Sequence, residues 1–424
     1  MRIGFFTDRY YPQTDGVGVS VDMFAHDLRK LGHTVYIFCP KGSYASKHSH
    51  SDHVDGPDVI RFPSIPGIWF EGYRDTFPWT KKNMNMIEDL NLDIVHIHTP
   101  GQVGMLGMYV AKSFGLPLVT TYHTDLVAYS QVYKRAFPGA IGLSFLLPIM
   151  AKDKTILRDA GKVLRPERTI PLWNAKIIQR MITVMHNNCD LVIAVSEKSR
   201  RQLKSYKTKT PIEVLPTGID WTEIRQPTNY NLRKQFSLPA DATILLYVGR
   251  IGVEKNLELA IRALQHILPK APYTYLVLAG PGSTLEIAKF KALASELKIE
   301  DNVVFTGVLN RSEVMGAFAS SNIFVFPSIA DTQGLVINEA CALGKPIVYV
   351  DDKISSLTQN NHNGYHAKNN ARDFAVKCLK LIEDPELCMR FGKASGKLAL
   401  SQSGEGQAKK LLSLYTQIAK PTKP

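Results

Sequence analysis

The stretch Pro327–Pro346, PSIADTQGLVINEACALGKP, decides how the rest of this 424-residue chain is interpreted. The apolar run Ile323–Phe326 comes directly before it and is typical of a buried strand. A loop of small and polar residues then leads to Leu335–Leu343, whose apolar residues have helical spacing. Gly344, followed closely by Pro346, is typical of a helix C-terminus. The stretch therefore predicts a strand, a loop and a helix, in that order.

The start of the expected helix is a candidate anion-binding site. The first turn of a helix leaves backbone N–H groups free, and the helix dipole favours a negative charge there. Asp331 lies just before this helix and Glu339 lies about two turns further on, so both carboxylates can face one ligand at different depths. Taken alone, the stretch is explained equally well by a plain strand–loop–helix unit with a solvated carboxylate.

Length and composition indicate a globular protein of more than one domain. Hydrophobic residues make up 45% of the chain and charged residues 21%, and at ~150 residues per domain the length predicts two or three domains. The N-terminus, MRIGFFTDRYYP, is interpreted as a first strand and not as a signal peptide. The five cysteines are scattered, without CxxC spacing, which indicates free thiols in a reducing cytoplasm and argues against a zinc site.

Positive charge is concentrated in one part of the chain. The net charge is +13, and residues 131–209 hold 16 Lys and Arg against 5 Asp and Glu. This basic segment implies a partner with an anionic surface. A nucleic-acid-binding protein is one interpretation, but no recognised binding module or regular aromatic platform accompanies the charge, so we expect no nucleic acid partner. The weakly polar run Gly139–Ala151 contains Pro148 and falls short of the ~20 residues that span a bilayer, so it is either a core helix or an interfacial one.

The same order of elements occurs twice along the chain. Each half begins with a strand, a glycine-containing loop, a helix and a second strand, which predicts two α/β domains, each with a doubly wound parallel sheet. We expect an N-terminal domain at 1–217, a connector within 218–240, a second domain at 218–400, and a last helix at 401–424 that packs back on the first domain. Ligands of such sheets bind beyond the carboxyl ends of the strands, which predicts a cleft between the two domains. The expected strands include Ile3–Thr7, Val35–Phe38, Val59–Phe62, Ile94–Ile97, Leu118–Thr121, Thr243–Val248, Tyr275–Leu278, Val303–Phe305 and Ile347–Val350.

Two loops that follow strands contain candidate phosphate-binding residues. Gly16 follows the first strand, which fits a close backbone approach to a phosphate, but the spacing is not GxGxxG and a turn at Asp15-Gly16 explains it equally well. The second loop, GRIGVEKN, starts at Gly249 and contains Arg250 and Lys255. Two cations beside a helix N-terminus suit a diphosphate, although each alone is more simply a solvated side chain.

Histidines gather at the ends of two first-half strands. His123 ends one strand, and an isolated histidine is more often a structural hydrogen-bonding group than a catalyst. His96 and His98 alternate to the same face of another strand, as a metal pair would, but no third ligand is suggested nearby. Nothing resembles a Ser-His-Asp triad or a P-loop. We therefore expect no metal site.

Taken together, these motifs resemble those of one family. DGVGVS, LGHTV, DIVHIHTP, TTYHTD, VGRIGVEKNLELAI and DTQGLVINEACALGKPIV follow one another over nearly the whole chain, as they do in the retaining family 4 glycosyltransferases. The resemblance implies a GT-B fold, with two Rossmann-like domains facing each other across a cleft. It also implies an enzyme that uses a nucleotide sugar as its donor and needs no cofactor.

The resemblance assigns roles to individual residues. Arg250 and Lys255 match the pair on the donor diphosphate, His123 matches a histidine near the sugar hydroxyl at C6, and Glu339 matches the carboxylate on the ribose. The first acidic position is usually Glu in the family, and here Asp331 is one methylene shorter at the sugar 3-hydroxyl. The implied catalytic residues are His123, Arg250, Lys255 and Asp331, and the implied donor-binding residues are Gly16, Gly249, Gln333, Gly334, Leu335, Val336 and Glu339.

Within the family, TQGL, YHTD and FPSIPGIWFEGYRDTFP resemble the bacterial enzymes that add glucose or galactose to diacylglycerol. Tyr73 and Arg74 match the acceptor-side loop of that subgroup. The basic segment 131–209 contains apolar residues edged by cations, which suits a lipid headgroup interface, each cation near an anionic leaflet contributing ~1 kcal/mol. We expect a cytoplasmic, peripheral enzyme on the inner face of the cell membrane that uses UDP-glucose. The open alternatives are a core helix with a solvated basic face, and a soluble sugar, a polyprenyl-linked glycan or phosphatidylinositol as the acceptor.

Overall fold

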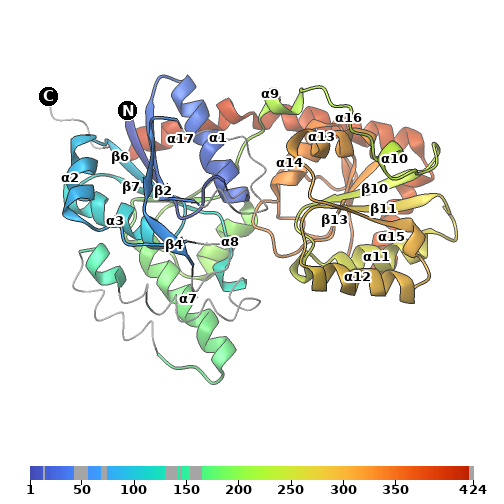
Figure 1. Cartoon of the computed structure of the whole chain (residues 1–424), viewed down its shortest axis with the longest axis horizontal. Coiled ribbons are helices and arrows are strands. Elements are labelled where there is room, and N and C mark those ends of the chain that lie inside the picture. Colours follow the sequence, from blue (N-terminus) through green and yellow to red (C-terminus); the bar gives the residue numbers. More distant parts are fainter. Residues whose placement is uncertain are drawn as a thin grey trace. The chain divides into compact units, whose positions relative to one another are not determined.

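The computed structural model describes residues 1–12, 15–42, 56–67, 74–128, 142, 146–152 and 165–419. Two compact units divide the chain (Figure 1): the first is Met1–Gly218 with Gly404–Pro424, and the second is Ile219–Ser403. Each unit is built on a parallel sheet with helices on its faces. The predicted fold class, two doubly wound α/β domains, is therefore confirmed.

The sheet of the first unit has seven parallel strands in the order β3-β2-β1-β6-β7-β8-β9. The order runs outward from β1 in both directions, which places the switch point between β1 and β6. Every residue of β6, β7 and β8 is buried, as expected for strands covered on both faces. The strands are β1 Arg2–Phe6, β2 Thr34–Pro40, β3 Val59–Phe62, β6 Ile94–Ile97, β7 Leu118–Tyr122, β8 Leu191–Ala194 and β9 Ile212–Val214.

The helices of the first unit include the last helix of the chain. In α17 (Gly404–Ile418), Ala408, Leu411 and Tyr415 lie in the same apolar core as Ile3 and Phe5 of β1. The terminal helix is thus part of the first unit and lies beside α1. The other helices are α1 Gly16–Lys30, α2 Lys81–Asp89, α3 Gln102–Phe114, α7 Ile170–Asn187 and α8 Glu197–Ser205, and an antiparallel hairpin joins β4 Ser64–Pro66 to β5 Arg74–Thr76.

The second unit has a six-stranded parallel sheet in the order β12-β11-β10-β13-β14-β15. Helices α11, α12 and α15 cover one face, and α13 and α14 cover the other (Figure 1). The strands are β10 Thr243–Val248, β11 Thr274–Ala279, β12 Val303–Gly307, β13 Ile323–Phe326, β14 Ile347–Tyr349 and β15 Gly364–His366. The helical segments are α9 Trp221–Ile224, α10 Leu232–Gln235, η1 Val253–Lys255, α11 Leu257–Ile267, α12 Thr284–Glu296, η2 Glu300–Asn302, α13 Arg311–Ser320, α14 Leu335–Ala342, α15 Ala371–Ile382, α16 Pro385–Ala399 and η3 Leu400–Gln402.

The strand order of the second unit brings two loops together. Because β10 and β13 are parallel neighbours, the loops after their carboxyl ends start side by side. The amide of Asn256 donates from Nδ2 to the carbonyl of Pro327 at 3.0 Å, which ties the two loops to each other. Gly280, after β11, also lies against this region: it has φ +143°, and a Cβ there would lie 2.1 Å from the carbonyl oxygen of Gly249. The loops at the switch point of this sheet, between β10 and β13, are therefore in close contact with one another.

Within the described residues, no helix is both long and apolar enough to cross a membrane. Residues 139–141 and 143–145 of the run Gly139–Ala151 lie outside the described residues. Of its described members, Leu147 and Met150 are buried in the core of the first unit, whereas Ile149 is 60% exposed.

Candidate active site

Lys255 and Asp331 meet at the switch point of the second unit. Lys255 ends η1 after β10, and Asp331 lies in the loop after β13, so neighbouring strands bring together residues that are 76 positions apart. Nζ of Lys255 lies 2.6 Å from Oδ1 of Asp331, and both side chains are about four-fifths buried. The pair places a cation and a carboxylate at the carboxyl edge of the sheet, where α/β proteins bind their ligands.

Helix α14 presents an open N-terminus to the same region. Its first residue follows Gly334, which adopts φ +67° and, as the N-cap residue, supplies no side-chain cap. The N–H of Ile337 donates to the carbonyl of Gly334 at 2.9 Å, so the N–H groups of Leu335 and Val336 precede the first hydrogen bond of the helix. Buried Gln333 lies next to this turn. N–H groups of this kind are what an anion binds at a helix N-terminus, and the anion site at Gln333–Val336 stays a prediction.

Arg250 lies on the same side of the sheet, two residues after β10. Gly249, which lies between the end of β10 and Arg250, has φ +146°, a conformation that side-chain-bearing residues rarely adopt. Nη2 of Arg250 lies 2.6 Å from Oε1 of Glu254, and the Arg250 side chain is 43% exposed. Arg250 and Lys255 therefore provide a solvent-accessible cation and a largely buried cation around one loop.

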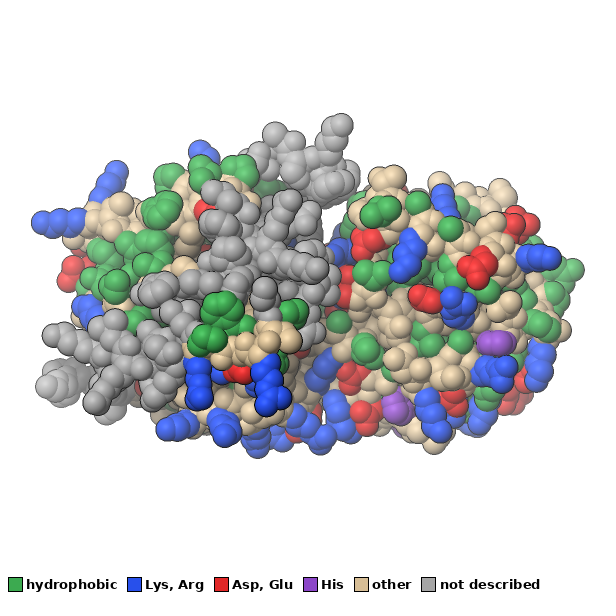
Figure 2. All heavy atoms as spheres, turned by 90° about the horizontal axis from the view of Figure 1, so that it is seen from below, with side chains coloured by type: hydrophobic (Ala, Val, Ile, Leu, Met, Phe, Trp, Pro, Cys, Tyr) green, Lys and Arg blue, Asp and Glu red, His purple; other side chains and the backbone are tan. Residues whose placement is uncertain are grey.

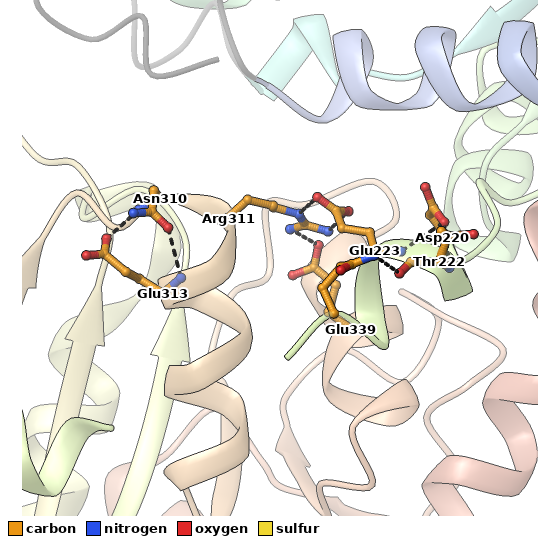
Figure 3. A network of polar contacts seen from close by, with 8 residues as sticks. Asp220, Thr222, Glu223, Asn310, Arg311, Glu313 and Glu339 are labelled. Atoms are coloured by element: carbon orange, nitrogen blue, oxygen red, sulfur yellow. Dashed lines mark hydrogen bonds and ion pairs between the residues drawn. The ribbon is translucent and has the colours of Figure 1, made fainter. Parts of the chain in front are cut away.

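Glu339 lies on α14 and is held by a residue that the sequence did not single out. Nη1 of Arg311 donates to Oε1 of Glu339 at 2.5 Å, and the guanidinium also donates to both carboxylate oxygens of Glu223, at 2.6 and 2.7 Å (Figure 3). Burial lowers the pKa of Arg311, but the charges of Glu339 and Glu223 outweigh burial and raise the pKa above its ordinary value. The Arg311–Glu223 bonds join residues 88 positions apart, so no local pattern could have revealed them.

His123 belongs to a row of stacked imidazoles in the first unit. The ring centroids of His96 and His98 are 4.1 Å apart, and those of His98 and His123 are 5.3 Å apart. Nδ1 of His98 lies 3.1 Å from Nε2 of His123, which fixes the second ring. Burial lowers the pKa of His123 to about 4, although the charge of Asp15 opposes this shift. His123 is therefore neutral near pH 7 and suited to hydrogen bonding with a neutral hydroxyl.

His96 faces the protein interior and not a ligand. Its Nδ1 lies 2.5 Å from the hydroxyl of Tyr415 on α17, and its Nε2 lies 2.7 Å from Oγ1 of Thr121. Burial lowers the pKa of His96 and of His98 well below the ordinary value. In the described part of the chain, no group of three His, Cys, Asp or Glu side chains is placed to hold a metal ion.

The N-terminus of α1, in contrast to that of α14, is capped by its own sequence. Oδ1 of Asp15 accepts from the N–H groups of Val17 and Gly18 at 3.0 and 2.9 Å, and Oδ2 lies 2.5 Å from Nε of Arg9. Gly16 starts this helix. The capping carboxylate already satisfies two N–H groups, which makes the N-terminus of α1 a poorer anion site than that of α14. A contact of Gly16 with phosphate or acceptor stays a prediction.

Of the two predicted acceptor-side residues, one is described. Arg74 begins β5 and donates from Nε to Oγ of Ser64 at 2.7 Å and from Nη2 to the carbonyl of Ser64 at 3.0 Å, which joins the two strands of the hairpin. Tyr73 lies outside the described residues. The role of both residues toward an acceptor stays a prediction.

Comparison with known protein families gives two matches that together cover most of the chain. Residues 14–223 match the model of Glycosyltransferase Family 4, and residues 229–398 match that of Glycosyl transferases group 1. The first match lies within the first unit apart from its last residues, and the second lies wholly within the second unit. The Lys255–Asp331 pair and the N-terminus of α14 fall in the group 1 match.

Similar proteins include two named lipid-modifying enzymes. The alpha-monoglucosyldiacylglycerol synthase of Streptococcus pneumoniae is 30% identical over 82% of this chain and 70% of its own length. The enzyme of the same name from Acholeplasma laidlawii is 25% identical over 99% of this chain and 97% of its own. A GDP-mannose-dependent alpha-mannosyltransferase from Mycolicibacterium smegmatis is 24% identical over 83% and 80%. The names of these similar proteins thus refer to different sugars, glucose in two of them and mannose in the third.

Solved structures share the fold over the full length of the chain. Anabaena HepE in complex with UDP-glucose superposes with a TM-score of 0.67 at 16% identity, covering 98% of this chain and 100% of that one. The two Rossmann-like units are therefore those of the GT-B fold.

Proposed function

Because the chain belongs to the family 4 glycosyltransferases, we propose that it transfers glucose from UDP-glucose to diacylglycerol with retention of configuration. The observation that carries the acceptor is the 30% identity to the S. pneumoniae alpha-monoglucosyldiacylglycerol synthase over 82% of this chain. The donor class is supported by the second unit, where two cations and an open helix N-terminus lie around one loop pair. Such groups suit the diphosphate of a nucleotide sugar.

We propose that the diphosphate is held by Lys255, Arg250 and the N–H groups of Leu335 and Val336. In the reaction, the bond from the sugar C1 to the diphosphate oxygen breaks, and the acceptor hydroxyl forms its bond to C1 on the same face. The departing diphosphate takes the proton of that hydroxyl. Negative charge develops on the diphosphate in the transition state, so preorganised donors there lower the barrier directly. The two cations take the part that a divalent metal plays elsewhere, and we propose that no cofactor is required.

We propose that the sugar itself contacts Asp331 and His123. Asp331 accepts from the 3-hydroxyl, and its ion pair with Lys255 fixes the carboxylate between the diphosphate and the sugar. His123 is suited to the hydroxyl at C6, because its low pKa keeps the ring neutral. Glu339 accepts from the ribose.

We propose that the first unit associates peripherally with an anionic membrane through the basic segment 131–209. The described part of this segment includes α8, in which four of nine residues are Lys or Arg and one is acidic. Figure 2 shows one face of the molecule, with Lys and Arg side chains along its lower edge in that view and some Asp, Glu and His side chains among them. Cations near an anionic leaflet are attracted without specific lipid contacts, so binding should weaken as salt is added.

The test combines the donor, the acceptor and the membrane. Purified protein is incubated with UDP-glucose, UDP-galactose, GDP-mannose or GDP-glucose and with vesicles that contain diacylglycerol, and the product mass is measured. We expect a hexosyl-diacylglycerol from UDP-glucose, and flotation of the protein with anionic but not with neutral vesicles. A product formed equally well without diacylglycerol, together with no flotation, would replace the lipid acceptor by a soluble one.

A second candidate keeps the fold and changes the donor and acceptor. The GDP-mannose-dependent relative favours it, because its identity to this chain is 24% over 83% of the chain, against 25% over 99% for the A. laidlawii enzyme. A soluble sugar, a polyprenyl-linked glycan and phosphatidylinositol are the acceptors to be compared. Transfer of mannose from GDP-mannose to any of these, with no transfer from UDP-glucose, would select this candidate.

A further inference from the structure

Glu339 has one satisfied and one unsatisfied carboxylate oxygen. Oε1 accepts from Nη1 of Arg311 at 2.5 Å, and the side chain is only 14% exposed. Oε2 is buried and has no hydrogen-bond partner among the described residues. A buried carboxylate oxygen without a partner is unfavourable unless a ligand supplies a donor. Ribose hydroxyls are donors of this kind, so this oxygen is the one that the donor nucleotide would satisfy.

Arg311 is itself fixed at the start of α13. Asn310 caps this helix by accepting from the N–H of Glu313 at 2.9 Å, and the Glu313 carboxylate accepts from the N–H of Asn310 at 2.7 Å. This reciprocal capping box holds the first turn in place (Figure 3). Arg311 is the first residue of that turn, so its Cα has a defined position relative to the sheet.

Glu223 holds the opposite side of the guanidinium. Nε and Nη2 of Arg311 donate to the two oxygens of Glu223, which is the bidentate arrangement that a planar guanidinium favours. Glu223 lies in α9, which Asp220 caps by accepting from the N–H groups of Thr222 and Glu223. Three of the donor nitrogens of Arg311 are therefore engaged by two carboxylates from different segments. These bonds fix both the orientation of the guanidinium plane and its position.

We propose that Arg311, held by Glu223, is a positioning residue that fixes the Glu339 carboxylate so that Oε2 accepts from a ribose hydroxyl of the donor nucleotide. The proposal rests on the proposed function, since it requires a nucleotide at this site. Carboxylate rotation is otherwise easy, and a single bond from Nη1 to Oε1 selects which oxygen faces the ligand. Arg311 itself makes no contact with the reacting atoms.

The test measures how strongly each variant recognises one hydroxyl. The dissociation constants of UDP, 2′-deoxy-UDP and 3′-deoxy-UDP are measured by calorimetry for the unchanged chain, Arg311→Ala and Arg311→Lys. We expect the unchanged chain to bind one deoxy analogue about 10- to 100-fold more weakly than UDP, the scale of a hydrogen bond to a charged group. Arg311→Ala should bind UDP about 10-fold or more weakly than the unchanged chain does. In this variant the deoxy penalty, which is the ratio of the dissociation constant of the deoxy analogue to that of UDP, should fall below about threefold. Arg311→Lys keeps the charge but not the fork, so it should lose most of the penalty as well.

Two further variants separate positioning from general stability. Glu223 is linked to Glu339 through Arg311. Glu223→Gln should therefore lower the deoxy penalty to a value between that of the unchanged chain and that of Arg311→Ala. This variant also provides the test if Arg311→Ala fails to fold. Arg262→Ala removes a comparable surface ion pair, with Glu258 on α11, and should leave the penalty unchanged. In transfer assays, the Arg311 variants should raise KM for the donor with a smaller change in kcat, because ribose binding is uniform along the reaction.

The outcomes distinguish the two levels of the proposal. If the unchanged chain binds UDP with a deoxy penalty and Arg311→Ala keeps that penalty in full, the positioning role is wrong while the proposed function stands. A variant that weakens UDP and its deoxy analogues equally also overturns the role, since Arg311 then acts elsewhere on the nucleotide. If the unchanged chain binds neither UDP nor GDP, the proposed function fails and the inference fails with it.

Discussion

Lys255 and Asp331 form a largely buried ion pair, with Nζ 2.6 Å from Oδ1, although 76 positions separate them in the chain. The pair exists because β10 and β13 are neighbours, so that the loops after these strands meet. In the proposed reaction it joins the residue that balances the charge of the leaving group to the residue that holds the sugar. Changes to either side chain should therefore affect catalysis more than folding.

Replacing Lys255 tests the charge on the leaving group. We expect Lys255→Ala to lower kcat by about 100-fold or more, the scale for losing one transition-state donor. Steady-state rates with the donor identified by the product assay give the measurement. Lys289→Ala, at an exposed position on α12, is the matched control and should keep the normal rate. A near-normal kcat for Lys255→Ala would remove Lys255 from the mechanism.

Asp331 is tested by changing its charge and its length separately. Asp331→Asn should lower kcat/KM by about 10-fold or more, because a hydrogen bond from the sugar to a charged group is exchanged for a weaker one and Lys255 loses its partner. Asp331→Glu restores the length usual in the family and should keep more activity than Asp331→Asn. Equal rates for Asp331→Asn and the unchanged chain would show that Asp331 does not hold the sugar.

Metal removal tests the proposal that Arg250 and Lys255 balance the charge of the diphosphate without a metal ion. Arg250 and Lys255 supply positive charge around the proposed diphosphate site. We therefore expect transfer rates to change by less than about twofold after dialysis against EDTA, and not to rise on adding Mg²⁺ or Mn²⁺. Rates are compared with those of the same sample before dialysis. A loss of activity that Mg²⁺ restores would mean that a metal shares the role of the two cations.

The buried histidines predict a pH-dependent stability. Burial lowers the pKa of His186 to about 3, below the ordinary 6.5 of the unfolded chain. Between these values the unfolded state binds a proton that the folded state does not, so this contribution to stability is complete above pH 6.5 and is lost as the pH falls toward 3. Each such histidine should contribute a slope of about 1.4 kcal/mol per pH unit in the free energy of unfolding.

Denaturant titrations between pH 4 and pH 7 measure this slope. His186→Met should reduce this slope by about 1.4 kcal/mol per pH unit, because the titrating group is removed from both the folded and the unfolded state. His362→Gln is the control, since His362 is exposed. Identical slopes for His186→Met and the unchanged chain would show that His186 is not the buried neutral group described here.

Much of the fold was predictable because local patterns encode it. The strands Val59–Phe62, Ile94–Ile97, Thr243–Val248 and Ile323–Phe326 have the bounds that their apolar runs predict. The strands β4, β5 and β15 were not predicted, because their three residues contain no apolar run, unlike the equally short β14.

The sequence by itself determined the strand β13, the N-terminus of α14 and the spacing of Asp331 and Glu339, since a few adjacent residues specify each of them. It did not reveal which side chains those carboxylates meet. Strand order brings Lys255 to Asp331, and the positions of α9 and α13 bring Glu223 and Arg311 to Glu339. Such pairings depend on how distant segments pack on the sheet, and only the tertiary structure decides that.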